Sequence, residues 1–529
     1  MPSKTAPGYN VTQAIFARAV QGDVTRPAVY YQDQVWTYGA VIRQVYQVSN
    51  GLRTLGVEPE QRVVILGYDS PYTMAALFGA MHRGAVPIPL NTSLPMEDYL
   101  YYLEDSRAKV LFVESAIWAQ LAPALRTRDV PLSSVILLPS IGIGLSADEA
   151  AYAGPLLFYR EWVEQQSVLP QEPRTRADDP AFWLYSSGST GAPKAAVHLH
   201  KDMMVCNRLY AEGILHITQQ DRLFSASKLF FAYGLGNGSY FALANEASVV
   251  LEPRKPDALT VLQDIAHYRP TIFFGVPTLF NAILRHPQSR DYDLSSLRAC
   301  VSAGEPLPAE IYTRWKTAYG VEILDGIGST EVLHIYISNR PGQSTPGNTG
   351  AVVPGYAVQI LDDQMHVVDP GTVGDLYVQG DSISPYYWGQ YQKTRRSMVG
   401  EWFKTGDKYY EDGDGHFVYC GRSDDMIKAG GIWVSPIEVE NVLLEHPAVA
   451  ETAVIGALDA DDLAKPVAYV VLGDEENPSE RLATELQEFV KSRLAHYKYP
   501  REIHFVEELP KTASGKIQRY RLRNGMVTS

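Results

Sequence analysis

The stretch 185–195 combines hydroxyl side chains, glycines and one lysine, which together can hold phosphate. Gly188 and Gly191 allow the backbone to turn so that successive amide groups converge on an anion. Lys194 supplies a positive charge beside them. The other candidate donors are the hydroxyl groups of Ser186, Ser187, Ser189 and Thr190. Because the spacing G-x-x-G-x-x-K differs from the Walker pattern and apolar segments lie on both sides, the sequence predicts a phosphate-binding turn between two strands.

A Ser/Gly-rich surface linker is the alternative interpretation of this stretch. Linkers rarely lie between two segments that are apolar enough to become buried strands. We therefore expect stretch 185–195 to bind phosphate, and we expect no helix dipole behind it.

A second run of glycines and hydroxyls, 323–331, ends in the carboxylate of Glu331. A carboxylate at this point can bind a magnesium ion that bridges phosphate groups. The alternative is the start of a helix, with Ser329 or Thr330 as the N-cap and Glu331 in the first turn. We expect the run itself to form a loop.

The segment 228–240 is rich in aromatic residues and glycine. Glycines let a flat apolar ligand approach the backbone closely, so this composition suits the wall of a pocket. Packing in the hydrophobic core is the alternative.

Alternating strand and helix patterns place these motifs in an α/β fold. Strands are predicted within 28–37 and at 63–66, 85–90, 110–113 and 135–138. Thr37 can cap a helix that ends at Gly56, and a second helix is predicted over 71–83. The strands predicted at 271–275 and 299–303 lead into loops, which is where α/β sheets bind ligands.

The pattern changes twice in the second half of the chain. Short strands and Gly/Pro turns predict a small β subdomain over 347–378. After residue 431, Ser435 and Glu438 form a capping box with proline at the first helical position. The other elements predicted there are strands near 452–457, 467–472 and 502–506 and a helix over 479–495. This region ends in a loop that carries Lys516.

The composition excludes several classes of protein. With 529 residues the chain is too long for a single hydrophobic core. Hydrophobic residues make up 46% of it, so it can form more than one core. Its net charge of -14, without a basic stripe, argues against nucleic acid or an anionic membrane as partner. Its three cysteines are far apart, so no disulfide framework is expected. With no signal peptide or membrane span in the sequence, we expect a cytoplasmic protein that handles small molecules.

Taken in this order, the motifs resemble those of the adenylate-forming superfamily of acyl-CoA synthetases, adenylation domains and luciferases. The resemblance covers nearly the full length of the chain. The stretches YSSGSTGAPKAAVHLH, FFAYGLGN and GIGSTEVLHIYISNRPG are most similar to those of benzoate-CoA ligases. The resemblance implies an N-terminal domain, 1–424, of two α/β subdomains and a small β subdomain. It also implies a small mobile α+β domain, 425–529, at the C-terminus.

The resemblance implies how the chain would bind ATP. The stretch 186–194 would embrace the β- and γ-phosphates, and Thr330 would contact the α-phosphate. Glu331 would bind Mg²⁺, and Lys516 would be the catalytic lysine of adenylation. Asp407 and Arg422 would bind the ribose hydroxyls. Two segments would cradle adenine, namely Gly304, Glu305 and Pro306 in the first and Asp325, Gly326, Ile327 and Gly328 in the second, and Ser329 would be a further ATP contact.

It also implies the other two substrate sites. The acyl group would contact Phe231, Ala232, Tyr233, Gly328, Leu333, His334 and Ile335. His334 would either orient the carboxylate or pack against the ring. The side facing coenzyme A would be formed by Lys428, Gly430, Gly431 and Trp433, where two glycines leave room for the pantetheine arm. Asp424 would be the hinge of the C-terminal domain.

The choice of acid follows from segment 228–240. A member that activates amino acids would place an acid there to pair the substrate ammonium, and the segment contains no Asp or Glu. Phe231, Tyr233 and Tyr240 crowd the tunnel that a fatty acid would need. The implied reaction is therefore ATP- and Mg²⁺-dependent ligation of benzoate, or a close aryl carboxylate, to coenzyme A through an acyl-AMP, as in aromatic compound degradation.

Three alternatives stay open, namely an enzyme that loads a carrier protein, a CoA ligase for another short acid, and a non-catalytic binding protein. A homodimer is the default expectation for assembly. Acetylation of Lys516 by a lysine acetyltransferase, reversed by a deacetylase, would remove the charge of that side chain and act as an off-switch.

Overall fold

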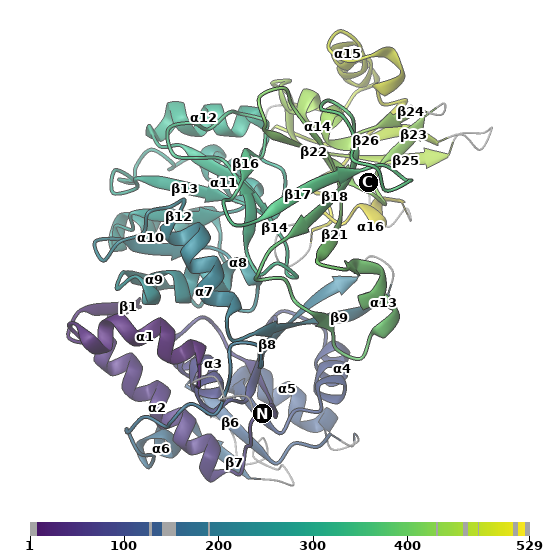
Figure 1. Cartoon of the computed structure of the whole chain (residues 1–529). Coiled ribbons are helices and arrows are strands. Elements are labelled where there is room, and N and C mark those ends of the chain that lie inside the picture. Colours follow the sequence, from purple (N-terminus) through teal and green to yellow (C-terminus); the bar gives the residue numbers. More distant parts are fainter. Residues whose placement is uncertain are drawn as a thin grey trace.

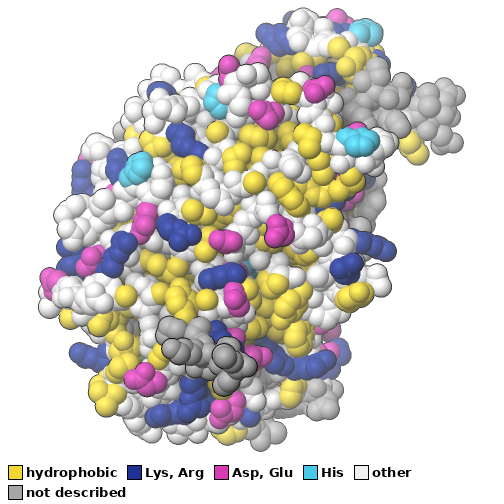
Figure 2. All heavy atoms as spheres, in the orientation of Figure 1, with side chains coloured by type: hydrophobic (Ala, Val, Ile, Leu, Met, Phe, Trp, Pro, Cys, Tyr) yellow, Lys and Arg dark blue, Asp and Glu magenta, His cyan; other side chains and the backbone are white. Residues whose placement is uncertain are grey.

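The computed structural model shows a large body with a smaller unit at one end (Figure 1). The residues that it describes are 8–125, 128, 130–139, 155–188, 191–429, 432–458, 464–473, 476–511 and 517–523. Basic and acidic side chains are interspersed over the face shown in Figure 2. No helix in this part of the chain is both long and apolar enough to cross a membrane.

A five-stranded parallel sheet lies in the N-terminal part of the body, in the order β4-β3-β5-β6-β7. Its strands are β3 (Arg62–Leu66), β4 (Val86–Pro89), β5 (Val110–Glu114), β6 (Ser134–Leu138) and β7 (Leu156–Phe158). The helices of this region are α1 (Val11–Gln21), α2 (Tyr38–Thr54), α3 (Pro71–Arg83), α4 (Met96–Ser106), α5 (Ser115–Leu125) and α6 (Tyr159–Glu164). α3 begins where the Ser70 side chain accepts a hydrogen bond from the Thr73 amide, and it ends at Gly84 in the left-handed conformation. The predicted βαβ unit is confirmed, with Thr37 as the N-cap of α2.

A nine-stranded sheet forms the centre of the body, in the order β16-β15-β14-β13-β12-β10-β11-β1-β2. Its strands are β1 (Pro27–Tyr31), β2 (Gln34–Thr37), β10 (Arg222–Ser225), β11 (Ser248–Leu251), β12 (Ile272–Gly275), β13 (Ala299–Ser302), β14 (Ile323–Gly328), β15 (Ile335–Ser338) and β16 (Ala351–Val352). The run from β1 to β14 is parallel, so the carboxyl ends of these strands meet at one edge. This confirms the strands predicted at 271–275 and 299–303.

The helical segments between these strands are α7 (Asp202–Cys206), the π-helical turn η1 (Asn207–Glu212), α8 (Ala232–Leu235), the π-helical turn η2 (Gly236–Tyr240), α9 (Phe241–Ala244), α10 (Ala258–Tyr268), α11 (Pro277–Arg285) and α12 (Ala309–Tyr319). Much of the aromatic segment 228–240 is therefore helical, in α8 and η2.

Two expectations for the run 323–331 are wrong. Residues 323–328 are not in a loop, because the backbone of 326–328 pairs with β15 and completes β14. The helix start considered for Glu331 is also wrong, because residues 329–334 form turns that lead directly into β15. A turn between two paired strands leaves no room for a helix here.

The predicted phosphate-binding stretch forms the end of an antiparallel hairpin, as expected. Its strands are β8 (Pro180–Gly188) and β9 (Gly191–Leu199), and β19 (Tyr386–Tyr387) pairs with β9 on the other side. The pairing continues to Gly188 and Gly191, so both strands run almost to the tip. Ser189 and Thr190 lie outside the described residues.

The small β subdomain extends further than the sequence predicts. Its sheet consists of β17 (Ala357–Leu361), β18 (Gly374–Gln379), β20 (Met398–Val399), β21 (Trp402–Glu411) and β22 (Phe417–Arg422), with α13 (Tyr391–Ser397) before β20. The expected end near Val378 is wrong, because β21 pairs with β18 on one side and β22 on the other. The stretch 402–422, which contains Asp407 and Arg422, thus belongs to this sheet.

The C-terminal unit contains the predicted helices and strands. Its strands are β23 (Ile427–Ala429), β24 (Ile432–Val434), β25 (Val449–Leu458), β26 (Ala464–Leu472) and β27 (Glu502–Phe505), and its helices are α14 (Pro436–Leu444), α15 (Glu480–Lys491), the 3₁₀ turn η3 (His496–Lys498) and α16 (Arg519–Arg523). Ser435 caps α14, but the carboxylate of Glu438 pairs with Lys498 at 2.6 Å, so the predicted box forms only in part. α15 ends at Lys491 and not near Ala495, because a separate turn, η3, precedes Pro500.

Gly51 is expected to tolerate no side chain, because α2 packs there directly on α6. A Cβ atom at Gly51 would lie 2.8 Å from ring atoms of Trp162. Alanine normally favours a helix interior over glycine by about 1 kcal/mol. Here we expect Gly51→Ala to lower the free energy of unfolding by about 1 to 3 kcal/mol, since the buried ring must shift. Urea unfolding measures the change.

Gly413→Ala is the matched control, because a Cβ atom at Gly413 would meet nothing within 4 Å. We expect this variant to be as stable as the wild type. Equal stability of all three proteins would contradict the close packing of α2 on α6.

Candidate active site

Lys194, Glu331 and Tyr387 form a cluster beside the end of the hairpin, in which Glu331 and Tyr387 are buried and Lys194 is half-buried. Lys194 Nζ lies 2.6 Å from Glu331 Oε1 and 3.0 Å from the Tyr387 hydroxyl oxygen. The Tyr387 hydroxyl donates to Glu331 Oε1 at 2.8 Å. The three side chains come from β9, from the turn after β14 and from β19. A predicted phosphate ligand thus contacts the predicted metal ligand directly, and both contact a tyrosine that the sequence analysis missed.

The charges in this cluster compensate one another. Burial alone would raise the pKa of the Glu331 carboxyl group. The charge of Lys194 and the hydrogen bonds from Lys194 and Tyr387 outweigh burial, so the pKa of Glu331 lies below its ordinary range. Burial, followed by the charge of Glu331, raises the pKa of Tyr387, so its hydroxyl keeps its proton. The site therefore holds an ionised carboxylate and an ammonium group in contact.

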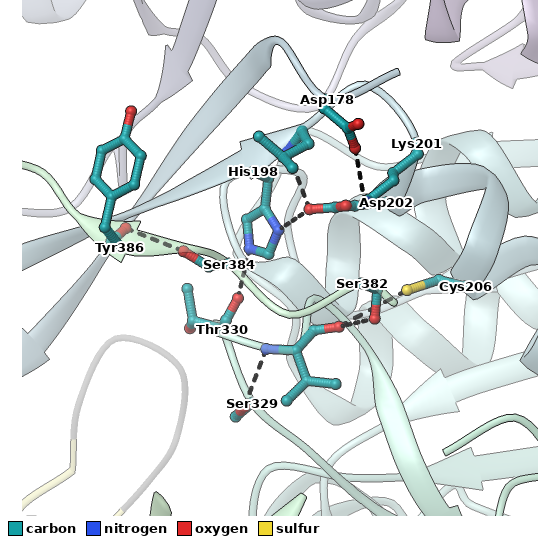
Figure 3. A network of polar contacts seen from close by, with 12 residues as sticks. Asp178, His198, Lys201, Asp202, Cys206, Ser329, Thr330, Ser382, Ser384 and Tyr386 are labelled. Carbon is teal, nitrogen blue, oxygen red and sulfur yellow. Dashed lines mark hydrogen bonds and ion pairs between the residues drawn. The ribbon is translucent and has the colours of Figure 1, made fainter. Parts of the chain in front are cut away.

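The turn 329–333, which carries Thr330 and Glu331, is held by hydrogen bonds from other elements to its backbone carbonyl groups (Figure 3). The carbonyl oxygens of three successive residues, 330–332, accept hydrogen bonds from other elements. The donors, in that order, are His198 Nε2 at 2.8 Å, the Ser384 amide at 2.7 Å and the Ser382 hydroxyl at 2.8 Å. The last residue of the turn has a φ of 75°, which is rare for a residue with a side chain. The sequence analysis assigned none of these three donors.

The segments predicted to hold adenine lie side by side at the carboxyl edge of the central sheet. Residues 304–306 follow β13, and residues 325–328 end β14, where Ser302 and Asp325 are register partners. Gly304 has a φ of 91°, which glycine adopts without strain. Burial raises the pKa of Asp325 above its ordinary range. Adjacent parallel strands thus bring both predicted segments to one place.

The two predicted ribose ligands contact each other. Asp407 and Arg422 are register partners in β21 and β22, and Arg422 Nη1 lies 3.0 Å from Asp407 Oδ1. Arg422 Nη1 also donates to the Thr405 carbonyl at 3.2 Å. The charge of Asp407 raises the pKa of the Arg422 guanidinium. Because Arg422 is about half exposed and Asp407 is buried, the pair presents a fixed polar edge to solvent.

The predicted acyl contacts form a wall of mixed exposure. Phe231, Ala232, Tyr233 and Gly328 are half-buried, whereas Leu333, His334 and Ile335 are buried. The rings of Tyr233 and His334 are 5.8 Å apart, and the Tyr233 hydroxyl donates to the Val301 carbonyl at 3.0 Å. The seven residues thus belong to one region, with the first four nearest the surface.

His334 occupies space that a glycine provides. A Cβ atom at Gly236 would lie 2.7 Å from the His334 ring, so this glycine makes room for the ring and not for a ligand. His334 Nε2 lies 3.1 Å from Asn237 Oδ1, and the ring packs against Tyr210 and Phe241. Burial lowers the pKa of His334 to about 3, so the ring is neutral near pH 7. Its suggested role in orienting a carboxylate stays a prediction.

The predicted residues of the C-terminal unit are described in part. Lys428 and Trp433 are register partners in the hairpin of β23 and β24. Asp424 is exposed in the turn after β22. Gly430, Gly431 and Lys516 lie outside the described residues. The roles of all these residues stay predictions.

The described residues suit a metal bound together with phosphate. Among them, no group of three His, Cys, Asp or Glu side chains is arranged to hold a metal ion. Mg²⁺ usually binds one or two carboxylates and takes its other ligands from water and substrate phosphates. A single carboxylate, Glu331, beside a phosphate-binding hairpin fits that mode. Ser186 Oγ is buried and has no hydrogen-bond partner in the described part of the chain, as expected of a donor awaiting a ligand.

Two protein-family models match most of the chain. Residues 16–388 match the family described as AMP-binding enzyme, and residues 438–516 match the AMP-binding enzyme C-terminal domain. The first match alone covers more than half of the chain. These matches confirm the resemblance to the adenylate-forming superfamily.

Individual relatives are similar over most of their length. A benzoate–CoA ligase of Thauera aromatica is 43% identical over 519 residues, 98% of this chain and 96% of the relative. A 4-hydroxybenzoate–CoA/benzoate–CoA ligase of Rhodopseudomonas palustris is 41% identical over 491 residues, 92% of this chain and 88% of the relative. A crystal structure of an anthranilate CoA ligase in complex with anthranoyl-AMP has a TM-score of 0.93, 39% identity and 98% coverage of both chains. The predicted fold class is therefore confirmed.

Lys194→Met is expected to destabilise the protein in a pH-dependent way. Without the charge and the hydrogen bond of Lys194, which lower the pKa of Glu331 in the wild type, the effect of burial dominates and raises that pKa. In the wild type the lowered pKa stabilises the fold above the range where free glutamates titrate, and this contribution is lost as the pH falls through the lowered pKa. We therefore expect a loss of about 3 kcal/mol at neutral pH that shrinks towards about pH 4. Urea unfolding at both pH values checks this.

Lys201→Met is the matched control, because Lys201 pairs with Asp178 at the surface. Exposed ion pairs contribute at most about 1 kcal/mol, so this variant should stay near the wild type at both pH values. A loss for Lys194→Met that is independent of pH would contradict the role given to Glu331.

Proposed function

We propose that this chain, which belongs to the AMP-binding enzyme family, is an ATP-dependent ligase that joins benzoate to coenzyme A. The observation that carries the proposal is the contact between Tyr233, in the acid-free aromatic segment, and His334, which follows Glu331 in the same turn region. An aromatic wall thus adjoins a site of paired charges suited to phosphate and metal. The similarity to ligases named for benzoate supports the same acid.

The reaction needs an activated acid. A carboxylate is a poor acyl donor because its leaving group would be oxide. In the proposed reaction the carboxylate oxygen attacks the α-phosphorus of ATP, which gives acyl-AMP and releases pyrophosphate. The thiol of coenzyme A then attacks the acyl carbon, and AMP leaves.

The residues described above divide this work. Lys194 and the hairpin amides would hold the phosphates, and Thr330 would contact the α-phosphate. Asp407 and Arg422 would bind the ribose. Mg²⁺, held by Glu331 and phosphate oxygens, would neutralise charge on the departing pyrophosphate. Lys516 would stabilise the charge that develops at the α-phosphate, and its loss would cost about 3 to 4 kcal/mol, or 10² to 10³ in rate.

We further propose that the two steps use two arrangements of two domains, 1–424 and 425–529. Asp424, exposed in its turn, would be the hinge. Rotation would withdraw Lys516 after adenylation and bring the stretch 428–433 to the site, where Gly430 and Gly431 leave a path for the thiol. A homodimer and acetylation of Lys516 remain further proposals.

Anthranilate is the second candidate acid, because the overall fold is so similar to that of the anthranilate CoA ligase. One small substituent in an apolar pocket changes discrimination by only about 1 to 3 kcal/mol, so the two acids are close competitors. A carrier protein could replace coenzyme A as acceptor without any change in the first step.

A screen of acids tests the substrate. We expect ATP- and Mg²⁺-dependent pyrophosphate release with a higher kcat/KM for benzoate than for 4-hydroxybenzoate, anthranilate, octanoate or acetate, because a flat unsubstituted ring suits the aromatic wall. Thioester formation with free coenzyme A is measured in parallel. Preference for octanoate or acetate would refute the aromatic substrate. Preference for anthranilate would favour the second candidate, and turnover with a carrier protein alone would exclude coenzyme A.

Two variants separate the half-reactions. Lys516→Ala should lose adenylate formation from benzoate and ATP but still convert supplied benzoyl-AMP to benzoyl-CoA, because the second step expels AMP without that charge.

Asp424→Pro fixes φ at the proposed hinge and should do the reverse, with one burst of about one equivalent of pyrophosphate and little benzoyl-CoA. Equal loss of both steps in either variant would contradict the division between two arrangements.

A further inference from the structure

We propose that His198 and Asp202 are a positioning pair that holds the turn 329–333 in the conformation needed for adenylation. His198 belongs to β9, and Asp202 begins α7 directly after that strand. Neither residue would touch ATP. The inference rests on the proposed function, because its importance depends on Thr330 and Glu331 meeting the phosphates and the metal.

The His198 ring lies between two acceptors (Figure 3). Its Nδ1 is 2.8 Å from Asp202 Oδ2, and its Nε2 is 2.8 Å from the Thr330 carbonyl oxygen. Asp202 Oδ2 also accepts a hydrogen bond from the Leu199 amide at 2.9 Å, as a carboxylate does. A carbonyl oxygen can only accept, so Nε2 must carry a hydrogen. The contact of Nδ1 with Asp202 Oδ2 holds the ring in the orientation that points this N–H at the Thr330 carbonyl oxygen.

Burial fixes the orientation of this pair. The side chains of His198 and Asp202 are both 0% exposed. The ring stacks on Phe182, with centroids 5.0 Å apart and an interplanar angle of 15°. Phe182 therefore fixes the plane of the ring, and Asp202 fixes its rotation within that plane. A buried donor held in this way has one partner to serve, the carbonyl of Thr330.

The turn depends on such external bonds. Its last residue has a φ of 75°, a conformation that persists only when the surroundings impose it. The loop 382–384 supplies two donors to the turn and His198 supplies a third, and the Cys206 thiol adds a weak fourth at 3.8 Å from the Val332 carbonyl oxygen. Lys194 and His198 both belong to β9, so one strand holds the carboxylate of Glu331 and the backbone of Thr330. The phosphate hairpin and the metal ligand are thereby kept in register.

Two substitutions separate the two hydrogen bonds of the ring. In His198→Asn the short amide replaces Nδ1 and still serves Asp202, but it cannot reach Thr330. We expect the rate of benzoyl-AMP formation to fall by about 10- to 100-fold, as for other residues that orient a metal ligand. In Asp202→Asn the new amide can donate to Nδ1, so the ring keeps its orientation and its hydrogen on Nε2, and the rate should stay within about twofold.

The other half-reaction and the free protein supply independent measurements. His198→Asn should lose much less than 10-fold in the conversion of supplied benzoyl-AMP and coenzyme A, since that step uses neither the metal nor the β- and γ-phosphates and keeps only the contact of Thr330 with the α-phosphate. Hydrogen exchange without substrate should be faster over residues 329–334 in His198→Asn but unchanged in Asp202→Asn. Lys201→Ala, which removes an adjacent exposed ion pair, should match the wild type in every measurement.

A second variant, His198→Phe with Asp202→Leu, removes the pair without leaving a buried charge, and it should behave like His198→Asn. Adenylation at the wild-type rate in either folded variant would overturn the proposal, and so would equal loss of both half-reactions. Asp202→Asn as slow as His198→Asn would overturn the role of the Nε2 hydrogen. If the wild type forms acyl-AMP from no aromatic acid, the proposed function fails, while hydrogen exchange still decides whether the pair holds the turn.

Discussion

The buried ion pair of Lys194 and Glu331 constrains the whole body of the protein. A charge removed from water destabilises a fold by several kcal/mol unless a partner lies in contact with it. The hairpin, the turn after β14 and the strand that carries Tyr387 must therefore meet at one point. In the proposed reaction each charge exchanges a protein partner for a ligand partner, since an ammonium suits phosphate and a carboxylate suits a metal. Binding would then replace a compensated pair with two compensated pairs, and no charge would be left alone.

The sheets serve this constraint in different ways. Parallel strands of the central sheet end at one edge, and their register places Ser302 opposite Asp325. The two segments predicted to hold adenine are therefore neighbours in space although they are separated in the sequence. The antiparallel pairing of β21 with β22 places Asp407 opposite Arg422 by the same logic. Register fixes these pairs more firmly than loop conformation could, because slipping a strand by one residue would turn every side chain to the opposite face.

Much of this arrangement follows from local sequence. The cap of α3 at Ser70, its end at Gly84 and the hairpin around stretch 185–195 are signalled by residues within a few positions of each other. Tyr387 has no such signal, because its role arises when β19 pairs with β9 far away in the chain. His198 had a partial signal in its spacing from Asp202, but its second acceptor is a backbone carbonyl, which leaves no trace in sequence. The sequence predicts a loop and not a strand at 323–328, since glycines usually indicate turns, but the pairing of 326–328 with β15 overrides them.

The distance along the chain between the members of the charged cluster affects how the protein is made. Lys194 and Tyr387 are 193 positions apart, and seven of the nine strands of the central sheet, β10 to β16, lie between the hairpin and the third strand of its sheet. Contacts of such long range form late in folding, because closing so large a loop must precede them. A nascent chain on the ribosome therefore lacks the complete cluster of Lys194, Glu331 and Tyr387 until β19 has emerged. By then the strands of the central sheet have all been synthesised, so the cluster stabilises only chains in which that sheet can be complete.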